Sequence, residues 1–298
     1  MATVLLQKIS AGDARTRGIL AALMGALLVS FDPVFVRLSG TRGVNTVFLF
    51  GLFTLISMSL IIQTTDRRGV IGTLKEDGWP VVLSGLLMFG SATTFILSIK
   101  YTAIANTVMI IGSRPVLTAI FSWLWLKEKA GLALWLAISM VICGIAIVVS
   151  GSLESVNILG DSLALLCVTF LAMNGAFQRK YKSMSRPAVV GMAGFFLAAG
   201  MIFFADIGSF TLRTWLIMGA MGLLSAPIGR VLNAVSVRYI LAAESAMITM
   251  SVSVFSTFWA ILFFNEIPPQ TTLAGGGVIL GSILTYVLIK LRQSRPSA

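Results

Sequence analysis

The sequence predicts an all-α integral membrane protein: ten transmembrane helices, arranged as two inverted five-helix repeats around a central cavity. Three observations lead to this fold class. The mean hydropathy is +0.96 and only 11% of residues are charged, which is too apolar for a soluble chain. The apolar stretches run about 20 residues, the length that crosses roughly 30 Å of hydrocarbon. The second half of the chain also repeats the first.

Short breaks rich in glycine, proline or charge separate the apolar stretches. The segment 1–17 is polar, mildly basic and leads straight into a full-length stretch, so we expect a cytoplasmic N-terminal segment without a cleavable signal. The first repeat is predicted over 18–150, the second over 151–290, and a cytoplasmic tail over 291–298. The ten predicted spans are approximately 18–38, 44–63, 79–99, 103–125, 131–150, 160–178, 188–206, 214–237, 243–264 and 270–290.

The internal repeat is visible as aligned residues in two places. The stretches Tyr101–Glu128 and Tyr239–Glu266 have equal length, and their matched pairs are Ala105 with Ala243, Thr107 with Ser245, Thr118 with Ser256 and Leu124 with Leu262. In the first span of each half, Gly18, Asp32, Phe35 and Arg37 align with Gly160, Asn174, Phe177 and Arg179. Five spans per copy place the second copy upside down. Inverted repeats of this kind are typical of secondary transporters, with the substrate bound between the halves.

The net charge of +11 is distributed unevenly between the predicted loops. With the N-terminus inside, 16 Lys and Arg residues fall on the inner side and 4 on the outer side. The positive-inside rule then predicts a multi-pass protein with both termini in the cytoplasm. Because the basic charge is explained by topology, we do not expect nucleic-acid binding.

The residue types exclude several kinds of chemistry. The chain has no histidine, which removes histidine-based acid–base catalysis and histidine metal sites. Cys143 and Cys167 both fall within apolar spans, where small packing residues are the ordinary interpretation. We expect no cofactor, no metal and no enzymatic activity.

Three ionisable residues fall within spans, where they are costly and usually functional or paired. Asp32 either lines a polar cavity or pairs with an arginine of another span, and its equivalent in the second copy is Asn174. Arg114 shares one helical face with Thr107 and Thr118, which can turn towards a hydrated cavity or serve packing. Arg230 belongs with Asn233 to a stripe of small and polar residues that forms either a helix contact or a cavity wall.

The remaining candidates are hinges, aromatic side chains and a small-residue motif. Pro33, Pro115, Pro227 and Gly229 weaken their helices and are predicted bending sites. Phe95 and Phe177 are candidates for stacking on an aromatic substrate. Gly277 and Gly281 form a GxxxG motif, which allows a homodimer or close packing within the bundle; we favour a monomer.

The two halves, the paired stretches ending in Glu128 and Glu266, and the glycines after them resemble the EamA family of the drug/metabolite transporter superfamily. The resemblance covers about 15–292 and is most like the YddG-type exporters of aromatic amino acids. It implies a bacterial inner-membrane protein with a cavity lined mainly by spans 1, 3, 4, 6, 8 and 9. Asp32, Asn174, Arg114 and Arg230 fall on those spans.

The function predicted from these features is export of amino acids, aromatic and other small neutral ones, by alternating access within a lipid bilayer. An alternative with the same fold is export of hydrophobic or cationic drugs or of a metabolite anion. An intramembrane enzyme and a channel are the other classes that a ten-span chain allows. The missing histidine disfavours the enzyme, and no ring of identical charges indicates an ion channel.

Overall fold

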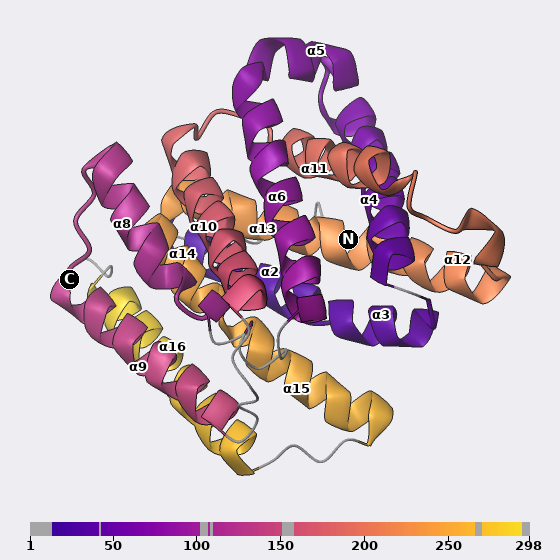
Figure 1. Ribbon diagram of the computed structural model, residues 1–298. Coiled ribbons are helices and arrows are strands. Elements are labelled where there is room, and N and C mark those ends of the chain that lie inside the picture. Colours follow the sequence, from indigo (N-terminus) through magenta and orange to yellow (C-terminus); the bar gives the residue numbers. More distant parts are fainter. Residues whose placement is uncertain are drawn as a thin grey trace.

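A computed structural model describes residues 14–41, 43–101, 107, 110–150, 158–265 and 270–293, and all the regular structure in these ranges is helical (Figure 1). The predicted N-terminal segment and C-terminal tail fall largely outside these ranges, as do Ala105 and Glu266. The first repeat contains α2 (Ala14–Val29), α3 (Asp32–Ser39), α4 (Gly43–Thr65), α5 (Gly69–Asp77), α6 (Trp79–Tyr101), α8 (Arg114–Leu126) and α9 (Leu132–Ser150). The second contains α10 (Ile158–Lys180), α11 (Arg186–Met201), η1 (Ile207–Ser209), α12 (Leu212–Ala220), η2 (Met221–Ser225), α13 (Ala226–Tyr239), α14 (Ala242–Thr249), α15 (Ser251–Phe264) and α16 (Gln270–Gln293).

Within the described residues, five helical runs are long and apolar enough to cross a membrane, or six if the bent pair α5 and α6 counts as one span. The five runs are Ala14–Ser39, Gly43–Thr65, Ile158–Lys180, Leu212–Tyr239 and Ala242–Phe264. Three shorter apolar helices cover Leu132–Ile147, Arg186–Met201 and Leu273–Ile289. The structure therefore confirms an all-helical membrane fold and not the full count of ten spans. The predicted fourth span is described continuously only from 110 onward.

The long runs are broken where prolines enter the sequence. Helix α2 ends at Val29, and α3 begins at Asp32 with Pro33 in its first turn. Helices α8 and α13 likewise begin next to Pro115 and Pro227. Proline lacks an N–H, so it fits the first turn of a helix and interrupts the interior of one. A π-helical segment, η2, precedes α13 and adds a further irregularity at this point.

The helices of the two repeats pack against one another in a symmetric pattern (Figure 1). Helix α2 packs against α13, and its repeat equivalent α10 packs against α6, the equivalent of α13. Helix α4 packs against α11 and α9 against α16, so each pairs with its own equivalent. The interface between the halves therefore runs through the whole bundle, as expected for a repeat related by a pseudo-two-fold axis.

The aligned residues Arg37 and Arg179 lie at opposite ends of the bundle. The guanidinium of Arg37 stacks over the ring of Phe264, close to the end where the Ser39 carbonyl accepts from Thr214 at the start of α12. Arg179 instead donates to the carbonyls of Val237 and Arg238, at the far end of the same run, Leu212–Tyr239. We call the end with Arg179 the predicted cytoplasmic end, because the charge distribution of the sequence assigns it there.

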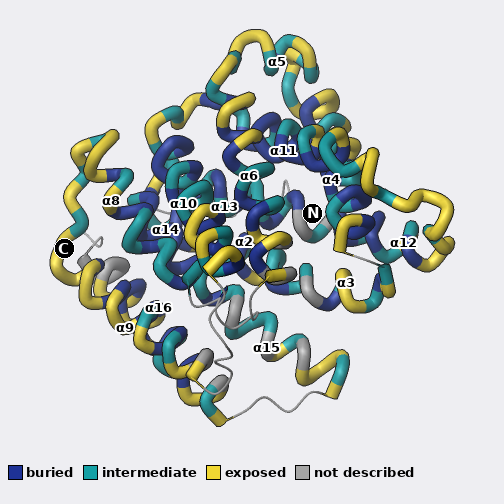
Figure 2. Tube along the Cα trace, viewed as in Figure 1, coloured by how far each residue is buried: buried dark blue, intermediate teal, exposed yellow. Residues whose placement is uncertain are grey.

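Residues are most buried where the helices pack against one another and most exposed on the outside of the bundle (Figure 2). The largest buried cluster joins α2, α9, α14 and α16 around Ile138, Met247 and Ile279. Large apolar side chains such as Leu132, Phe203 and Leu212 are exposed on the outside of the bundle. In a membrane protein such side chains face lipid rather than water.

Candidate functional site: a central cavity

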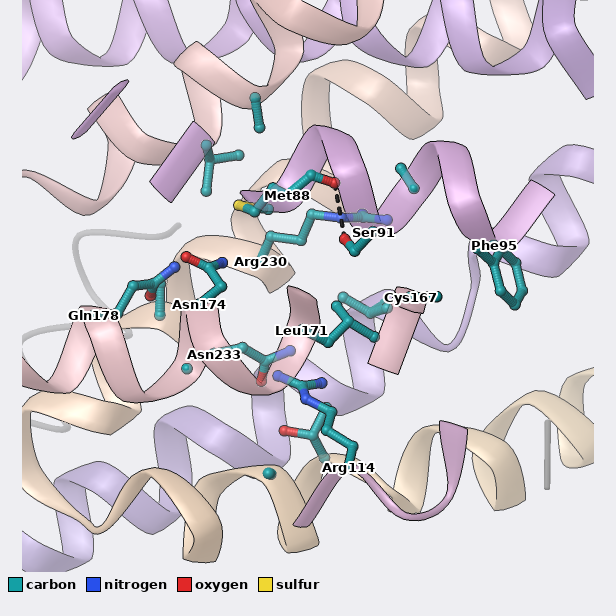
Figure 3. Close-up of a pocket in the computed structure, with 18 of the residues that line it drawn as sticks. Met88, Ser91, Phe95, Arg114, Cys167, Leu171, Asn174, Gln178, Arg230 and Asn233 are labelled. Carbon is teal, nitrogen blue, oxygen red and sulfur yellow. Dashed lines mark hydrogen bonds between the residues drawn. The ribbon is translucent and has the colours of Figure 1, made fainter. Parts of the chain in front are cut away.

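A cavity of about 420 Å³ lies between the two repeats (Figure 3). Helices α2, α4, α6, α8, α10, α11, α13 and α14 all contribute to its wall. Helices α4 and α11 were not among the spans expected to line it mainly. The volume lies within the range of about 300–1,000 Å³ that is common for small-molecule sites. Among the described residues, the polar side chains in the wall are those of Thr54, Ser91, Arg114, Asn174, Gln178, Arg230, Asn233, Ser245 and Thr249.

Arg114 is the first residue of α8, and its side chain reaches into the cavity (Figure 3). Its backbone carbonyl accepts a hydrogen bond from the Thr118 hydroxyl at 2.7 Å, which fixes the first turn. The Nε of its guanidinium is buried without a hydrogen-bond partner, and no described carboxylate pairs with it. Arg114 therefore brings an uncompensated positive charge to the cavity wall.

Arg230 also lines the cavity, but its guanidinium is paired with a carboxylate. Its Nη2 lies 3.0 Å from Oδ2 of Asp32, and its guanidinium stacks 4.5 Å above the ring of Phe50. Asp32 is not among the lining residues. Of the two interpretations of Asp32, the structure matches the pairing with an arginine on another helix. The wall of the cavity, within the described residues, contains no carboxylate.

Amide side chains form a second polar group in the cavity. Oδ1 of Asn174 accepts from the hydroxyl of Ser84 at 2.5 Å, and Nε2 of Gln178 donates to the same hydroxyl at 3.3 Å. Asn233 also lines the cavity, and its Oδ1 is buried without a hydrogen-bond partner. The cavity thus offers both amide groups and a guanidinium within one enclosed space.

The structure brings together some of the predicted site residues and separates others. Arg114, Arg230, Asn174, Asn233 and Phe95 all line the cavity. The other four predicted side chains are placed elsewhere: Asp32 pairs with Arg230, Thr107 hydrogen-bonds to Ser98, the Thr118 hydroxyl donates to the Arg114 carbonyl, and Phe177 packs against Trp79 and Tyr181. Of the predicted hinges, Pro33, Pro115 and Pro227 lie at helix starts. Gly229 instead lies inside α13, in close contact with Gly25 and Val29.

Several cavity residues were missed by sequence reasoning. Gln178 follows Asn174 by one helical turn on the same face, so its position was available from periodicity alone. Ser91, Thr54 and Thr249 carry no such signal, because single hydroxyl residues are common in apolar helices. Within the described residues, no three His, Cys, Asp or Glu side chains gather as a metal site.

Ion pairs join the helices at the predicted cytoplasmic end. Nη2 of Arg15 lies 2.7 and 2.8 Å from the two oxygens of Glu244, which is fully buried in the first turn of α14. Nε of Arg179 lies 3.0 Å from Oε1 of Glu128, just beyond α8. Arg179 therefore connects the ends of three helices, α8, α10 and α13.

Comparisons with known proteins agree with this architecture. A family model described as the EamA-like transporter family matches residues 16–150 and again 158–288. The "Uncharacterized transporter YyaM" of Bacillus subtilis (strain 168) is 25% identical over 149 residues, 48% of each chain. "Solute carrier family 35 member G1" of Mus musculus is 29% identical over 117 residues, 39% of this chain and 31% of the relative.

The alignments thus span less than half the length of these two relatives. One protein of known crystal structure has the same fold, with a TM-score of 0.80 at 18% identity over 93% of this chain and 99% of the other. The two matches of the family model fall one on each half of the chain and together cover nearly all of it. The chain therefore belongs to the EamA-like transporter family.

Proposed function

We propose that the protein is a secondary transporter that exports amino acids, aromatic and other small neutral ones, across the bacterial inner membrane. Ten spans, with both termini in the cytoplasm, alternate the access of the central cavity between the two sides. The observation that carries this proposal is Arg114, a cation on the cavity wall with no carboxylate partner among the described residues.

An α-carboxylate is the group that best fits Arg114. Guanidinium and carboxylate form two parallel charge-assisted hydrogen bonds, and these are strong where water is excluded. A buried arginine without a counter-ion is costly, and a bound carboxylate removes that cost while the solute is present. Affinity thus comes from a group that every amino acid shares, which suits a broad substrate range.

The rest of the cavity supports a neutral amino acid. The amide groups of Asn174 and Asn233 line the cavity as polar partners for an ammonium group, and Asp32 stays paired with Arg230. Phe50, Phe95 and Met88 supply apolar wall for a side chain, including an aromatic one. The ammonium group of a neutral amino acid therefore needs no carboxylate in the cavity wall.

A metabolite anion is the second candidate, because the described wall holds positive charge and no carboxylate. The same observation disfavours a dicationic drug, which would enter a cavity without acidic partners. An amino acid carries an ammonium group that needs an acceptor, whereas a simple anion carries none. A substitution of Asn233 therefore distinguishes the two candidates.

The test is flux of radiolabelled phenylalanine, threonine and lysine into proteoliposomes, with and without an imposed pH gradient. We expect protein-dependent flux of phenylalanine and threonine. Arg114→Gln should reduce it at least about tenfold, the effect of losing roughly 1.4 kcal/mol of binding. Arg213→Gln, at an exposed arginine of α12, is the matched control and should transport normally.

Two outcomes would contradict the proposal. Absence of amino-acid flux in vesicles that contain folded protein would favour the anion. Normal flux in Arg114→Gln would remove the proposed carboxylate site. If Asn233→Leu lowers phenylalanine flux and leaves competition by simple carboxylates unchanged, the ammonium acceptor is assigned to Asn233.

A further inference from the structure

Arg186, the first residue of α11, is buried without a counter-ion. It is 1% exposed and lies at the predicted cytoplasmic end. Its Nη2 donates to the carbonyl of Gln178 at 2.8 Å, but Nε and Nη1 are buried and have no hydrogen-bond partner. No described carboxylate lies within ion-pair distance of it. A buried cation with unmade hydrogen bonds costs several kcal/mol, so its surroundings favour an anion.

Arg238, near the end of α13, is the neighbour of Arg186 and also has a buried nitrogen without a hydrogen-bond partner. Its Nη2 donates to the carbonyl of Met184 at 2.6 Å, while its Nε is buried without a partner. The two guanidinium groups repel each other, and the carboxylate of Asp77 attracts both. Unlike Arg186, Arg238 is only partly buried.

Asp77 does not neutralise the two arginines, because other donors engage its oxygens. Oδ2 accepts from the backbone N–H of Ser185 at 2.7 Å, and Oδ1 lies 3.4 Å from Nη1 of Arg68. Two arginines and one shared carboxylate leave a net positive charge. The positive end of the α11 helix dipole adds to it, since Arg186 opens that helix.

This positive group adjoins residues of the cavity wall. Gln178, whose carbonyl binds Arg186, lines the cavity with its side chain. Val237, which precedes Arg238, also lines it. The arginines are therefore one residue or one hydrogen bond away from the cavity wall, on the side opposite to the Asp32–Arg230 pair along α13.

We propose that Arg186 and Arg238 form an oxyanion-binding subsite at the predicted cytoplasmic floor of the cavity. It holds the carboxylate or phosphate group of the transported solute before that group reaches Arg114. The assignment rests on the proposed function, because it concerns the same solute and the same cavity. Five N–H donors per guanidinium and a planar fork make arginine pairs suited to oxyanions.

The experiment measures binding of inorganic phosphate to the purified full-length protein in an uncharged detergent, without any transport. Phosphate is titrated at constant ionic strength, and the thermal unfolding midpoint is followed by tryptophan fluorescence. A ligand that binds the folded state raises this midpoint with a saturable concentration dependence. We expect such a rise in the wild type, and an apparent affinity about tenfold weaker in Arg238→Gln and in Arg186→Lys.

Two controls locate the ion. Arg213→Gln, outside both sites, should keep the full response, and Arg114→Gln, in the central cavity, should keep the part of the response that Arg238→Gln removes. Because Arg186 is buried, the result for its variant is used only if that variant still unfolds in a cooperative transition without phosphate. Arg238→Gln, at a partly exposed residue, decides the question if Arg186→Lys does not fold.

Three results would overturn the proposal. One is a wild type with no saturable response. The second is a response that Arg114→Gln abolishes and Arg238→Gln retains, which would place the ion in the central cavity. The third is competition by added phosphatidylglycerol but not by added phosphatidylcholine, which would assign the arginines to a lipid headgroup. Failure of amino-acid flux would leave the phosphate result untouched, so the two proposals fail separately.

Discussion

Asp32 and Arg230 form an ion pair between the two repeats, with 3.0 Å between Oδ2 and Nη2. Asp32 begins α3, directly after the break between α2 and α3. Arg230 lies near the start of α13, which follows the π-helical segment η2. The ion pair therefore joins two irregular points of the bundle. The second oxygen of Asp32 is buried without a hydrogen-bond partner. The charges of two helices, each costly in a membrane, thus offset each other beside the cavity.

Removing one partner of this ion pair should destabilise the protein more than removing both partners. Asp32→Asn leaves Arg230 without its counter-ion, and we expect a loss of roughly 2–3 kcal/mol, below the ~3–5 kcal/mol of a fully buried pair. The double variant Asp32→Asn with Arg230→Gln should recover most of that loss. A double-mutant cycle on unfolding by denaturant in detergent measures the coupling.

The opposite result is equally informative about Asp32. If Asp32→Asn unfolds like the wild type while its flux no longer responds to a pH gradient, the carboxylate carries a coupled proton and its pairing is secondary.

Gly25 and Gly229 allow α2 and α13 to approach closely. A Cβ at Gly25 would clash with the side chain of Asn233 and lie 2.7 Å from the carbonyl of Gly229. Gly25→Ala should therefore lower stability by about 1–3 kcal/mol, as overpacking does, and lower flux because Asn233 is displaced. Unfolding in detergent and proteoliposome flux check the two effects.

Gly277→Ala is the matched control for this clash. A Cβ at Gly277 meets nothing within 4 Å, and the same holds for Gly281. The GxxxG motif of α16 is therefore not used for packing within the described part of the chain. If Gly277→Ala destabilises the protein as much as Gly25→Ala, the explanation by close approach is wrong.

Glu128 and Arg179 should hold the predicted cytoplasmic end closed. Arg179 also binds two carbonyls of α13, so loss of Glu128 loosens a junction of three helices. We expect Glu128→Gln to increase, several-fold, the reaction of a cysteine at Ala242 in the cavity wall with an impermeant maleimide. Inside-out vesicles and a chain without Cys143 and Cys167 make the reaction specific.

Glu76→Gln is the control for Glu128→Gln. Its carboxylate also pairs with an arginine, Arg68, but it is 63% exposed and does not line the cavity. Such surface pairs contribute little. Equal labelling in both variants would mean that Glu128 does not restrict access.

Polarity in apolar helices was the part of the site that the sequence could predict. Arg114, Arg230, Asn174 and Asn233 stand out because each is costly in lipid, and all four line the cavity. The breaks at Pro33, Pro115 and Pro227 were predictable for a similar reason, since proline removes a backbone donor.

Partners and side-chain directions could not be predicted in this way. One sequence does not tell whether Asp32 faces the cavity or Arg230, because both satisfy its charge. Phe177 aligns with Phe35 and looks available for stacking, yet packs against Trp79 and Tyr181. The count of ten spans stays a prediction, since five or six helical runs within the described residues are long and apolar enough to cross a membrane.

The two repeats contain equivalent pairs of buried hydroxyl groups. Ser98 and Thr107 are hydrogen-bonded at 2.7 Å, and their aligned counterparts Ser236 and Ser245 at 2.5 Å. Inversion places the first pair away from the predicted cytoplasmic end and the second near it. Each pair connects the end of one helix to the segment that follows.

The equivalence predicts comparable effects of Ser98→Ala and Ser236→Ala on the free energy of unfolding. Each variant removes a hydrogen bond between two buried hydroxyl groups, which contributes about 0.5–1.5 kcal/mol. Ser98→Ala should be the more costly of the two, because Ser98 also donates to the carbonyl of Gly160 in the other repeat, whereas Ser236 donates to Asn233 within its own helix. Replacing both members, Ser236→Ala with Ser245→Ala, should recover part of the loss, since no donor is then stranded. A cost confined to one repeat would mean that the hydroxyl pairs are equivalent in sequence only, and that the two ends of the transporter are closed by different contacts.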